Sequence, residues 1–306
     1  MNDVLFNDQP ALGYQEKGKS VDNMRKLNFL PIVLIVMALL VSACGNNDKG
    51  ASTNNASTGE NGSNNGKADT TAAATLESVK ASGKLRIGTE GTYAPFTYHD
   101  AAGKLTGFDV DIATEVSKRL GVQPEFIETQ WDGIFAGLNS KRFDTVFNEV
   151  SITDKRKQKY DFSDPYIVSK AVLIVSEDNT DIHKFADLKG KKAGQSLTSN
   201  LTQIAKSNGA EIVATEGFNQ AIDLLTSKRV DATVNDGLSY LDLKKQKPDA
   251  PIKKVDESAD ASHSAAVFNK GSEDLIKAVN KALADMKADG TYLKISEKYF
   301  GADVSK

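Results

Sequence analysis

One polar segment, residues 148–156, holds the side chains best suited to bind a small anion, and it reads N-E-V-S-I-T-D-K-R. It puts the Ser151 hydroxyl and the Arg156 guanidinium beside the backbone N–H groups of a predicted helix start. A helix start has unpaired N–H donors at the positive end of its dipole, and one arginine can bind two oxygens of a carboxylate. The segment therefore suits a carboxylate.

The same segment also has a purely structural interpretation. Ser151 or Thr153 would be the N-cap of a short helix, because a hydroxyl there accepts a hydrogen bond from the helix backbone. The basic residues would then form a solvated face: Lys155, Arg156, Lys157 and Lys159. The segment by itself leaves both interpretations open.

Two further segments put polar groups at the ends of predicted strands. Residues 194–200, G-Q-S-L-T-S-N, follow a short strand and are rich in hydroxyl groups, among them that of Thr198. They suit either helix capping or a second anion site. Asp236 lies between a strand and a helix, so its carboxylate either caps that helix or pairs with an ammonium ion.

Aromatic residues lie at two other strand ends. The loop T-E-G-T-Y-A-P-F contains Glu90, Tyr93 and Phe96 and follows the strand 85–88. Loops at the carboxyl ends of strands are where ligands usually bind in open α/β sheets. Trp131, the only tryptophan, starts a helix directly after a strand. It either stacks on a ligand or fills the core.

The elements that must position these residues alternate between strand and helix from Thr75 onward. One apolar stripe predicts a helix that ends at Gly121; its members are Phe108, Ile112, Val116 and Leu120. Extended segments are predicted at 85–88, 124–128, 143–147, 171–175, 192–193, 211–214, 231–234 and 264–268. The last two helices are predicted around 275–290 and 292–300. Two α/β series in tandem predict two lobes of about 100 residues each.

The N-terminal part carries a sorting signal. An apolar run at 27–43 follows two basic residues and is short for a bilayer span, so residues 24–43 are predicted to be a secretory signal peptide. The run ends in V-S-A-C, which resembles the signal box of bacterial lipoproteins. Cys44 is the only cysteine in the chain. Its position predicts a lipid anchor rather than an intermolecular bridge or an inert thiol.

The residues on either side of the signal are predicted not to belong to the folded body. Residues 44–74 have almost no large apolar side chain and are predicted to be a disordered tether. Residues 1–23 are interpreted as an extension that is not translated, with synthesis starting at Met24.

The net charge of the chain, −3 in 306 residues, does not indicate the basic surface that nucleic-acid binding requires.

The motifs together resemble those of a known family. G-T-E-G-T-Y-A-P-F, G-F-D-V-D-I, S-I-T-D-K-R, Y-D-F-S-D-P-Y and D-G-T-Y-L-K-I-S-E-K-Y-F-G are similar to motifs of the extracellular solute-binding proteins of family 3. These proteins serve ATP-binding-cassette (ABC) importers of polar amino acids. The resemblance covers residues 75–306, and W-D-G-I-F-A-G-L-N-S-K-R-F-D and the terminal F-G-A-D-V are most similar to the cystine-binding branch.

The resemblance implies an α/β fold of the Venus-flytrap kind, similar to type II periplasmic binding proteins. Two lobes would be joined by two crossover strands, near 169–173 and 263–268, with the ligand between the lobes. The first lobe would comprise 75–169 and 264–306, and the second 170–263. The protein would be a monomer without cofactor or metal.

The resemblance also implies roles for ten residues. Arg156 would clamp the ligand carboxylate with Ser151 and Thr198, and Asp236 would bind the ammonium group. The remaining residues would line the pocket or the segment beside the clamp: Glu90, Tyr93, Phe96, Trp131, Asn148 and Glu149. Glu149 departs from the cystine-binding pattern, which usually has Gln there. It would weaken binding of an anionic group or point away. Glu90 would favour a ligand with a distal cation, such as lysine or ornithine, although cystine also has a second ammonium group.

The function that the resemblance implies is capture of a polar amino acid, with L-cystine as the first choice, and delivery to an ABC permease. The protein would be anchored through Cys44 on the extracytoplasmic face of the cell membrane, and it would not be an enzyme. One alternative is a secreted lyase similar to cyclohexadienyl or arogenate dehydratase on the same fold, with Glu149 or Glu90 as the general acid. Another is a surface adhesin.

Overall fold

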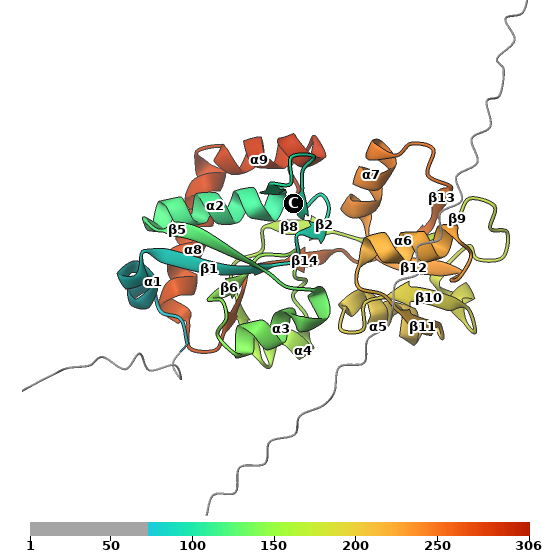
Figure 1. Cartoon of the computed structure of the whole chain (residues 1–306), viewed down its shortest axis with the longest axis horizontal. Helices are drawn as coiled ribbons and strands as arrows, with labels where there is room; N and C mark the ends of the chain where they lie inside the picture. The colour runs from blue at the N-terminus through green and yellow to red at the C-terminus, as the bar shows by residue number, and fades with distance from the viewer. Residues whose placement is uncertain (1–72) are drawn as a thin grey trace, which may run out of the picture. The chain divides into compact units, whose positions relative to one another are not determined.

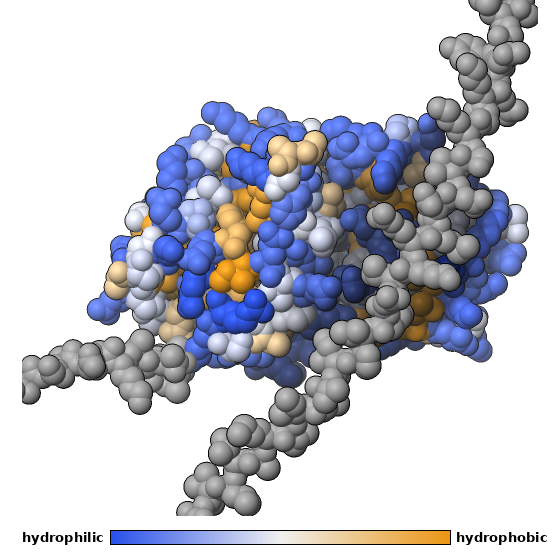
Figure 2. Space-filling view, in the orientation of Figure 1, coloured by the Kyte–Doolittle hydropathy of each residue, from blue (hydrophilic) through white to orange (hydrophobic). Residues whose placement is uncertain are grey.

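The computed structural model describes residues 73–306. The predicted N-terminal extension, the signal peptide, Cys44 and all but the end of the tether lie outside the described residues. No helix between residues 73 and 306 has the length and apolar character needed to cross a membrane. Hydrophilic residues cover most of the face drawn in Figure 2, and hydrophobic ones show in small areas.

The first lobe is built on a five-stranded sheet with helices on both faces (Figure 1). In spatial order its strands are β5 (Gln123–Glu128), β1 (Lys84–Thr89), β6 (Thr145–Val146), β15 (Val267–Asn269) and β7 (Tyr160–Phe162). Strand β1 pairs in parallel with β5 and β6, and β15 is antiparallel to β6 and β7. The helices are α1 (Leu76–Ser82), α2 (Phe108–Leu120), α3 (Trp131–Asn139), α4 (Asp154–Lys157), α8 (Glu273–Ala288) and α9 (Thr291–Phe300).

Two apolar clusters fill the two faces of this sheet. On one face α2 and α8 pack against β1, and the buried side chains include Phe108, Ile112 and Val279. On the other face α3 packs against β6, with Ile134 and Leu138 buried. The predicted stripe of α2 is buried, and Gly121 ends that helix with a φ of 77°. These predictions are confirmed.

The second lobe has a five-stranded sheet of the same kind. In spatial order its strands are β11 (Glu211–Ala214), β10 (Lys192–Gln195), β12 (Ala232–Asp236), β9 (Ala171–Ser176) and β13 (Ile252–Glu257). Strands β10, β11 and β12 are parallel, whereas β9 is antiparallel to β12 and β13. The helices are α5 (Asn200–Ser207), α6 (Phe218–Thr226), α7 (Gly237–Gln246) and the 3₁₀ turn η1 (Phe185–Leu188). The predicted fold class, α/β with two lobes, is confirmed.

Two crossover strands join the lobes. Strand β8 (Ile167–Ser169) pairs antiparallel with β14 (Ser262–Ser264), so that Ser169 lies opposite Ser262. The crossovers predicted at 169–173 and 263–268 are present, but their paired part begins earlier in the chain. The crossover pairing ends at Ser169 because the apolar run from Ala171 forms strand β9, which is buried between β12 and β13 in the second sheet.

The structure also differs from the sequence predictions at two short elements. The strand predicted at 143–147 reduces to β6, because Phe143 turns its buried ring toward α3. The loop predicted at 89–96 forms part of a small antiparallel sheet with β2 (Thr92–Tyr93), β3 (Thr97–His99) and β4 (Leu105–Thr106). This small sheet anchors Tyr93 and the residues before it.

The packing of Phe143 generates a test of how α3 is positioned. A Cβ atom added at Gly137 would lie 2.6 Å from the Phe143 ring, whereas one at Gly133 on the same helix would lie 3.4 Å from Thr129. Gly137→Ala should therefore lower the free energy of unfolding by about 1–3 kcal/mol through overpacking. Gly133→Ala, the matched control, should leave it unchanged or raise it by about 0.5–1 kcal/mol. Urea unfolding measures both, and equal gains in the two variants would contradict the packing.

Candidate functional site

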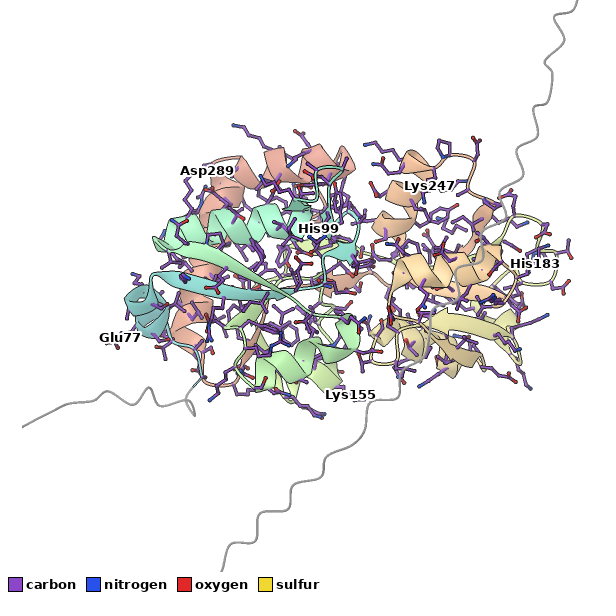
Figure 3. The ribbon with its side chains drawn as sticks, in the orientation of Figure 1. Glu77, His99, Lys155, His183, Lys247 and Asp289 are labelled. Atoms are coloured by element: carbon purple, nitrogen blue, oxygen red, sulfur yellow. The ribbon has the colours of Figure 1, made fainter. Side chains whose placement is uncertain are left out.

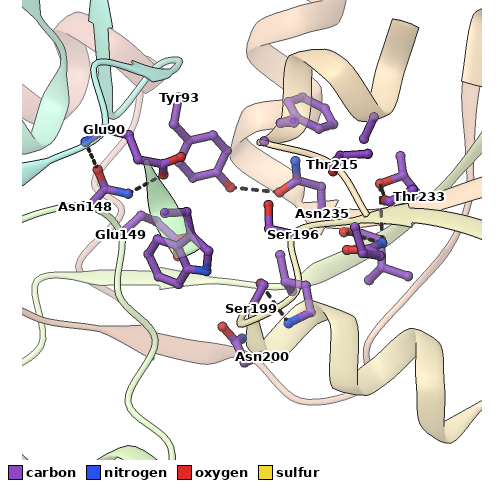
Figure 4. A pocket seen from close by; sticks show the side chains of 18 residues that line it. Glu90, Tyr93, Asn148, Glu149, Ser196, Ser199, Asn200, Thr215, Thr233 and Asn235 are labelled. Atoms are coloured by element: carbon purple, nitrogen blue, oxygen red, sulfur yellow. Dashed lines mark hydrogen bonds between the residues drawn. The ribbon is translucent and has the colours of Figure 1, made fainter. Parts of the chain in front are cut away.

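A cavity lies between the lobes where the carboxyl ends of their parallel strands meet (Figure 4). The first lobe lines it with Glu90, Tyr93, Trp131, Asn148 and Glu149. The second lobe lines it from the segments 194–201, 215–221 and 233–235. Five of the ten predicted site residues thus share one cavity wall. This is the edge at which open α/β sheets bind ligands.

Arg156 lies beside this cavity on the short helix α4. Thr153 caps the helix by accepting a hydrogen bond from the Arg156 backbone N–H at 3.2 Å, as the structural interpretation of the segment predicted. The Arg156 side chain, however, is only 8% exposed and does not join the solvated face. Lys155, Lys157 and Lys159 are exposed. Figure 3 shows Lys155 at the outer edge of the fold.

Among residues 73–306, the groups in direct contact with the Arg156 guanidinium are neutral, while the charge of Glu149 acts on it from beyond ion-pair distance. Its Nη1 donates to the carbonyl oxygen of Ser151 at 2.8 Å and to Oδ1 of Asn200 at 3.2 Å. Its Cζ lies 5.3 Å from the ring centroid of Trp131 and 5.1 Å from that of Phe135. Burial lowers its pKa to about 10, so the group remains a cation at neutral pH.

One nitrogen of this guanidinium has no hydrogen-bond partner in the described part of the chain. Among residues 73–306, no carboxylate lies within ion-pair distance of Arg156, and its buried Nη2 has no hydrogen-bond acceptor. A buried cation with an unsatisfied donor destabilises the folded state unless an anion pairs with it and accepts the hydrogen bond. The arrangement therefore suits a carboxylate ligand bound through charge-assisted hydrogen bonds.

The group that faces Arg156 from the second lobe is Asn200, not Thr198. Ser199 caps α5 by accepting from the Leu201 backbone N–H, and this turns Asn200 toward the cavity. Asn200 also donates from Nδ2 to the Ser151 hydroxyl at 3.2 Å. The signal in the sequence was Ser199 as the N-cap, which sets the orientation of the next residue.

Thr198 lies at the rim, where it bonds to the other lobe. Its backbone N–H and its hydroxyl donate to Oδ1 of Asp132 at 2.9 and 2.7 Å, and the Leu197 N–H donates to Oδ2 at 3.1 Å. Asp132 belongs to the first turn of α3. Nothing in the sequence singles out Asp132, because an acidic residue in a first helical turn is common.

Asp236 occupies the start of α7, where it acts as the N-cap. Its Oδ1 accepts from the Leu238 backbone N–H at 2.8 Å, and its Oδ2 accepts from the Ser169 hydroxyl. The residue is 3% exposed, and burial raises its pKa to about 6. Its neighbour Asn235 lines the cavity and accepts from the Tyr93 hydroxyl at 2.8 Å.

Glu149 adopts a left-handed backbone with a φ of 49°. Its backbone N–H donates to Asp109 at 2.7 Å, and its carboxyl accepts from the Ser264 hydroxyl at 2.7 Å. Burial, reinforced by the charge of Asp236, raises the pKa of Glu149 well above its ordinary value. The carboxyl thus contacts the crossover strand β14 from the wall of the cavity.

Glu90 forms a reciprocal pair with Asn148. Its backbone N–H donates to Oδ1 of Asn148 at 2.7 Å, and Nδ2 of Asn148 donates to its carboxyl at 2.6 Å. Burial raises the pKa of Glu90 to about 7. Phe96, by contrast, does not line the cavity: it is fully buried, with its ring centroid 5.3 Å from that of Tyr93.

Two α/β lobes joined by two crossover strands, with a buried cation and buried carboxylates around a shared cavity, define a two-lobed binding protein for small charged molecules. The sequence profile of the bacterial extracellular solute-binding proteins, family 3, matches residues 85–302, and the chain belongs to this family. The resemblance seen in the sequence is thereby confirmed.

Three proteins similar to this chain are binding proteins or receptors for amino acids. The L-cystine-binding protein TcyA of Bacillus subtilis is 45% identical over 282 residues, which are 92% of this chain and 100% of that protein. An ancestral arginine-binding protein bound to arginine is 42% identical, with a TM-score of 0.68, over 71% of this chain and 98% of the other. The L-cystine solute receptor of Neisseria gonorrhoeae, in an unliganded open conformation, is 43% identical, with a TM-score of 0.53, over 76% of this chain and 100% of the other.

The raised pKa of Glu90 predicts a pH dependence of stability. Because the folded state binds this proton more tightly than the unfolded chain, folding loses stability as the pH rises from about 4.5 to about 7. Glu90→Gln keeps an acceptor for Asn148 but removes this titration. Urea unfolding at about pH 5 and about pH 8 should therefore show a smaller fall in the variant than in the unmodified protein. An identical fall in both proteins would contradict the assignment.

Proposed function

We propose that the protein captures a polar amino acid, with L-cystine as the preferred ligand, and delivers it to the permease of an ABC importer. The observation that carries this proposal is the buried Arg156 guanidinium, whose Nη2 lacks an acceptor among the described residues. The family and the 45% identity to an L-cystine-binding protein support the choice of ligand.

In this proposal a zwitterion is bound by both lobes at once. The α-carboxylate binds Arg156 and the hydroxyl and amide groups of Ser151 and Asn200. The α-ammonium group binds on the acidic side, where Asp236 and Glu149 are buried. Arg156 and Asp236 come from different lobes, so a ligand that contacts both favours the closed arrangement over an open one by its differential affinity.

Glu90 supports a ligand with a second positive charge. It is a buried carboxylate on the cavity wall without an ion-pair partner among residues 73–306. L-cystine has a second ammonium group that would pair with it. Arginine, which is bound by the ancestral relative, is the second candidate because its guanidinium would reach the same carboxylate.

We further propose that the protein acts as a binding protein and not as a lyase. The relatives named above are binding proteins or receptors. The two acids on the cavity wall, Glu90 and Glu149, each accept a hydrogen bond from a neighbouring side chain of the protein. Mass spectrometry of a ligand released from the protein distinguishes the two functions, because a binding protein returns it unchanged.

The clamp is tested by Arg156→Ala, with Lys155→Ala on the same turn as the control. Arg156→Ala should weaken L-cystine binding by about 100-fold or more, because at least two charge-assisted hydrogen bonds of about 1.5–3 kcal/mol each are lost. Lys155→Ala should leave the affinity unchanged, since that side chain is exposed. Calorimetric titration measures both. Affinity that survives in Arg156→Ala would remove Arg156 from the site.

The membrane anchor on Cys44 is a separate part of the proposal, supported by the V-S-A-C sequence at the end of the apolar run. Cys44→Ala should abolish lipid attachment, since a thiol is the group modified. Cells given labelled palmitate should label the unmodified protein and not the variant. A serine substitution at a tether residue, the control, should leave the label in place. Palmitate label on Cys44→Ala would refute the anchor.

A further inference from the structure

The far end of the cavity, away from Arg156, contains a hydroxyl group, that of Thr215, to which the proposed function assigns no role. Thr215 follows the end of β11 and lines the cavity from the second lobe (Figure 4). It is only 5% exposed, and in the described part of the chain its Oγ1 has no hydrogen-bond partner. A buried hydroxyl without a partner destabilises the fold, so its presence here points to a ligand group.

The N-terminus of α6 lies at the same end of the cavity. This nine-residue helix begins after Gly217, which has no side chain to cap it, and both Gly217 and Phe218 line the cavity. The backbone N–H groups of Phe218, Asn219 and Gln220 have no acceptor among residues 73–306. Uncapped N–H groups at the positive end of a helix dipole bind anions.

Contacts between the lobes fix this end of α6. Nδ2 of Asn219 donates to the carbonyl oxygen of Thr92 at 3.1 Å, across the cleft. Glu90 lies opposite: its Oε1 is 3.8 Å from where a Cβ atom on Gly217 would be, and its Oε2 is held by Asn148. Unpaired donors from the second lobe and a buried carboxylate from the first therefore face one another.

We propose that this end of the cavity binds the second amino-acid group of a ligand that has two. The distal carboxylate binds the Thr215 hydroxyl and the N-terminus of α6, and the distal ammonium group binds Glu90. The inference rests on the proposed function, because it takes Arg156 to hold the first carboxylate. L-cystine satisfies both sets of groups. Arginine satisfies Glu90 alone and leaves the donors of Thr215 and α6 unused.

The distal carboxylate and the distal ammonium group can be tested separately with two mixed disulfides. The disulfide of L-cysteine with cysteamine lacks only the distal carboxylate, and that with 3-mercaptopropionate lacks only the distal ammonium group. Calorimetric titration of the purified protein should show each binding at least about ten-fold more weakly than L-cystine, because each leaves buried polar groups unpaired.

The variant Thr215→Val tests whether the Thr215 hydroxyl binds the distal carboxylate of the ligand. Thr226→Val, at the other end of α6, is the control. Thr215→Val should weaken L-cystine binding by about ten-fold and leave the cysteamine disulfide unaffected, since that ligand has no carboxylate to lose. The variant should melt no lower than the unmodified protein in the absence of ligand, because the hydroxyl removed has no hydrogen-bond partner among residues 73–306. Thr226→Val should change neither affinity.

The outcomes separate the inference from the proposed function. If the unmodified protein binds L-cystine and the cysteamine disulfide equally, or if Thr215→Val weakens both equally, the distal site is wrong while the proposed function stands. If the protein binds arginine and not L-cystine, both the ligand and the distal site are wrong. Comparing L-cystine with the cysteamine disulfide on the unmodified protein decides whether the distal carboxylate contributes to binding, without any variant.

Discussion

The arrangement of the cleft depends on one constraint, the burial of the Arg156 cation with no carboxylate of residues 73–306 within ion-pair distance. Two aromatic rings, a backbone carbonyl and the amide of Asn200 hold the guanidinium, and none of them carries a negative charge. Its charge therefore stays available to a ligand. The short helix α4, capped by Thr153, fixes the backbone from which it projects.

The acidic side of the cavity is linked to the segments that join the lobes. The hydroxyls of Tyr166, Ser169 and Ser264, in or next to the crossover strands, donate to Asp109, Asp236 and Glu149 in that order. Burial raises the pKa of all three carboxyls. The bond from Ser169 to Asp236 connects the crossover strand β8 to the second lobe, whereas the other two stay within the first lobe.

Most of the fold was readable from the sequence because hydrophobic periodicity and glycine positions encode local structure, as in α2 and its end at Gly121. Arg156 could also be predicted as a carboxylate-binding residue, since few residue types bind a carboxylate in this way. The contacts between the lobes could not be predicted from the sequence. Asn200 rather than Thr198 faces Arg156 because Ser199 caps α5, and Phe96 lies behind Tyr93 because the β2–β3 turn folds it into the core. Which side chains face the cavity depends on their orientation, and that orientation is determined by tertiary packing.

The hydrogen bonds of Asp132 to residues 197 and 198 have a kinetic consequence. They join the lobes at the rim through protein atoms alone, so they slow opening by the same factor for every ligand and add nothing to selectivity. Ligand residence time is then longer than contacts with the ligand account for. Asp132, Leu197 and Thr198 are exposed at the rim, so these bonds form and break independently of any contact with the ligand.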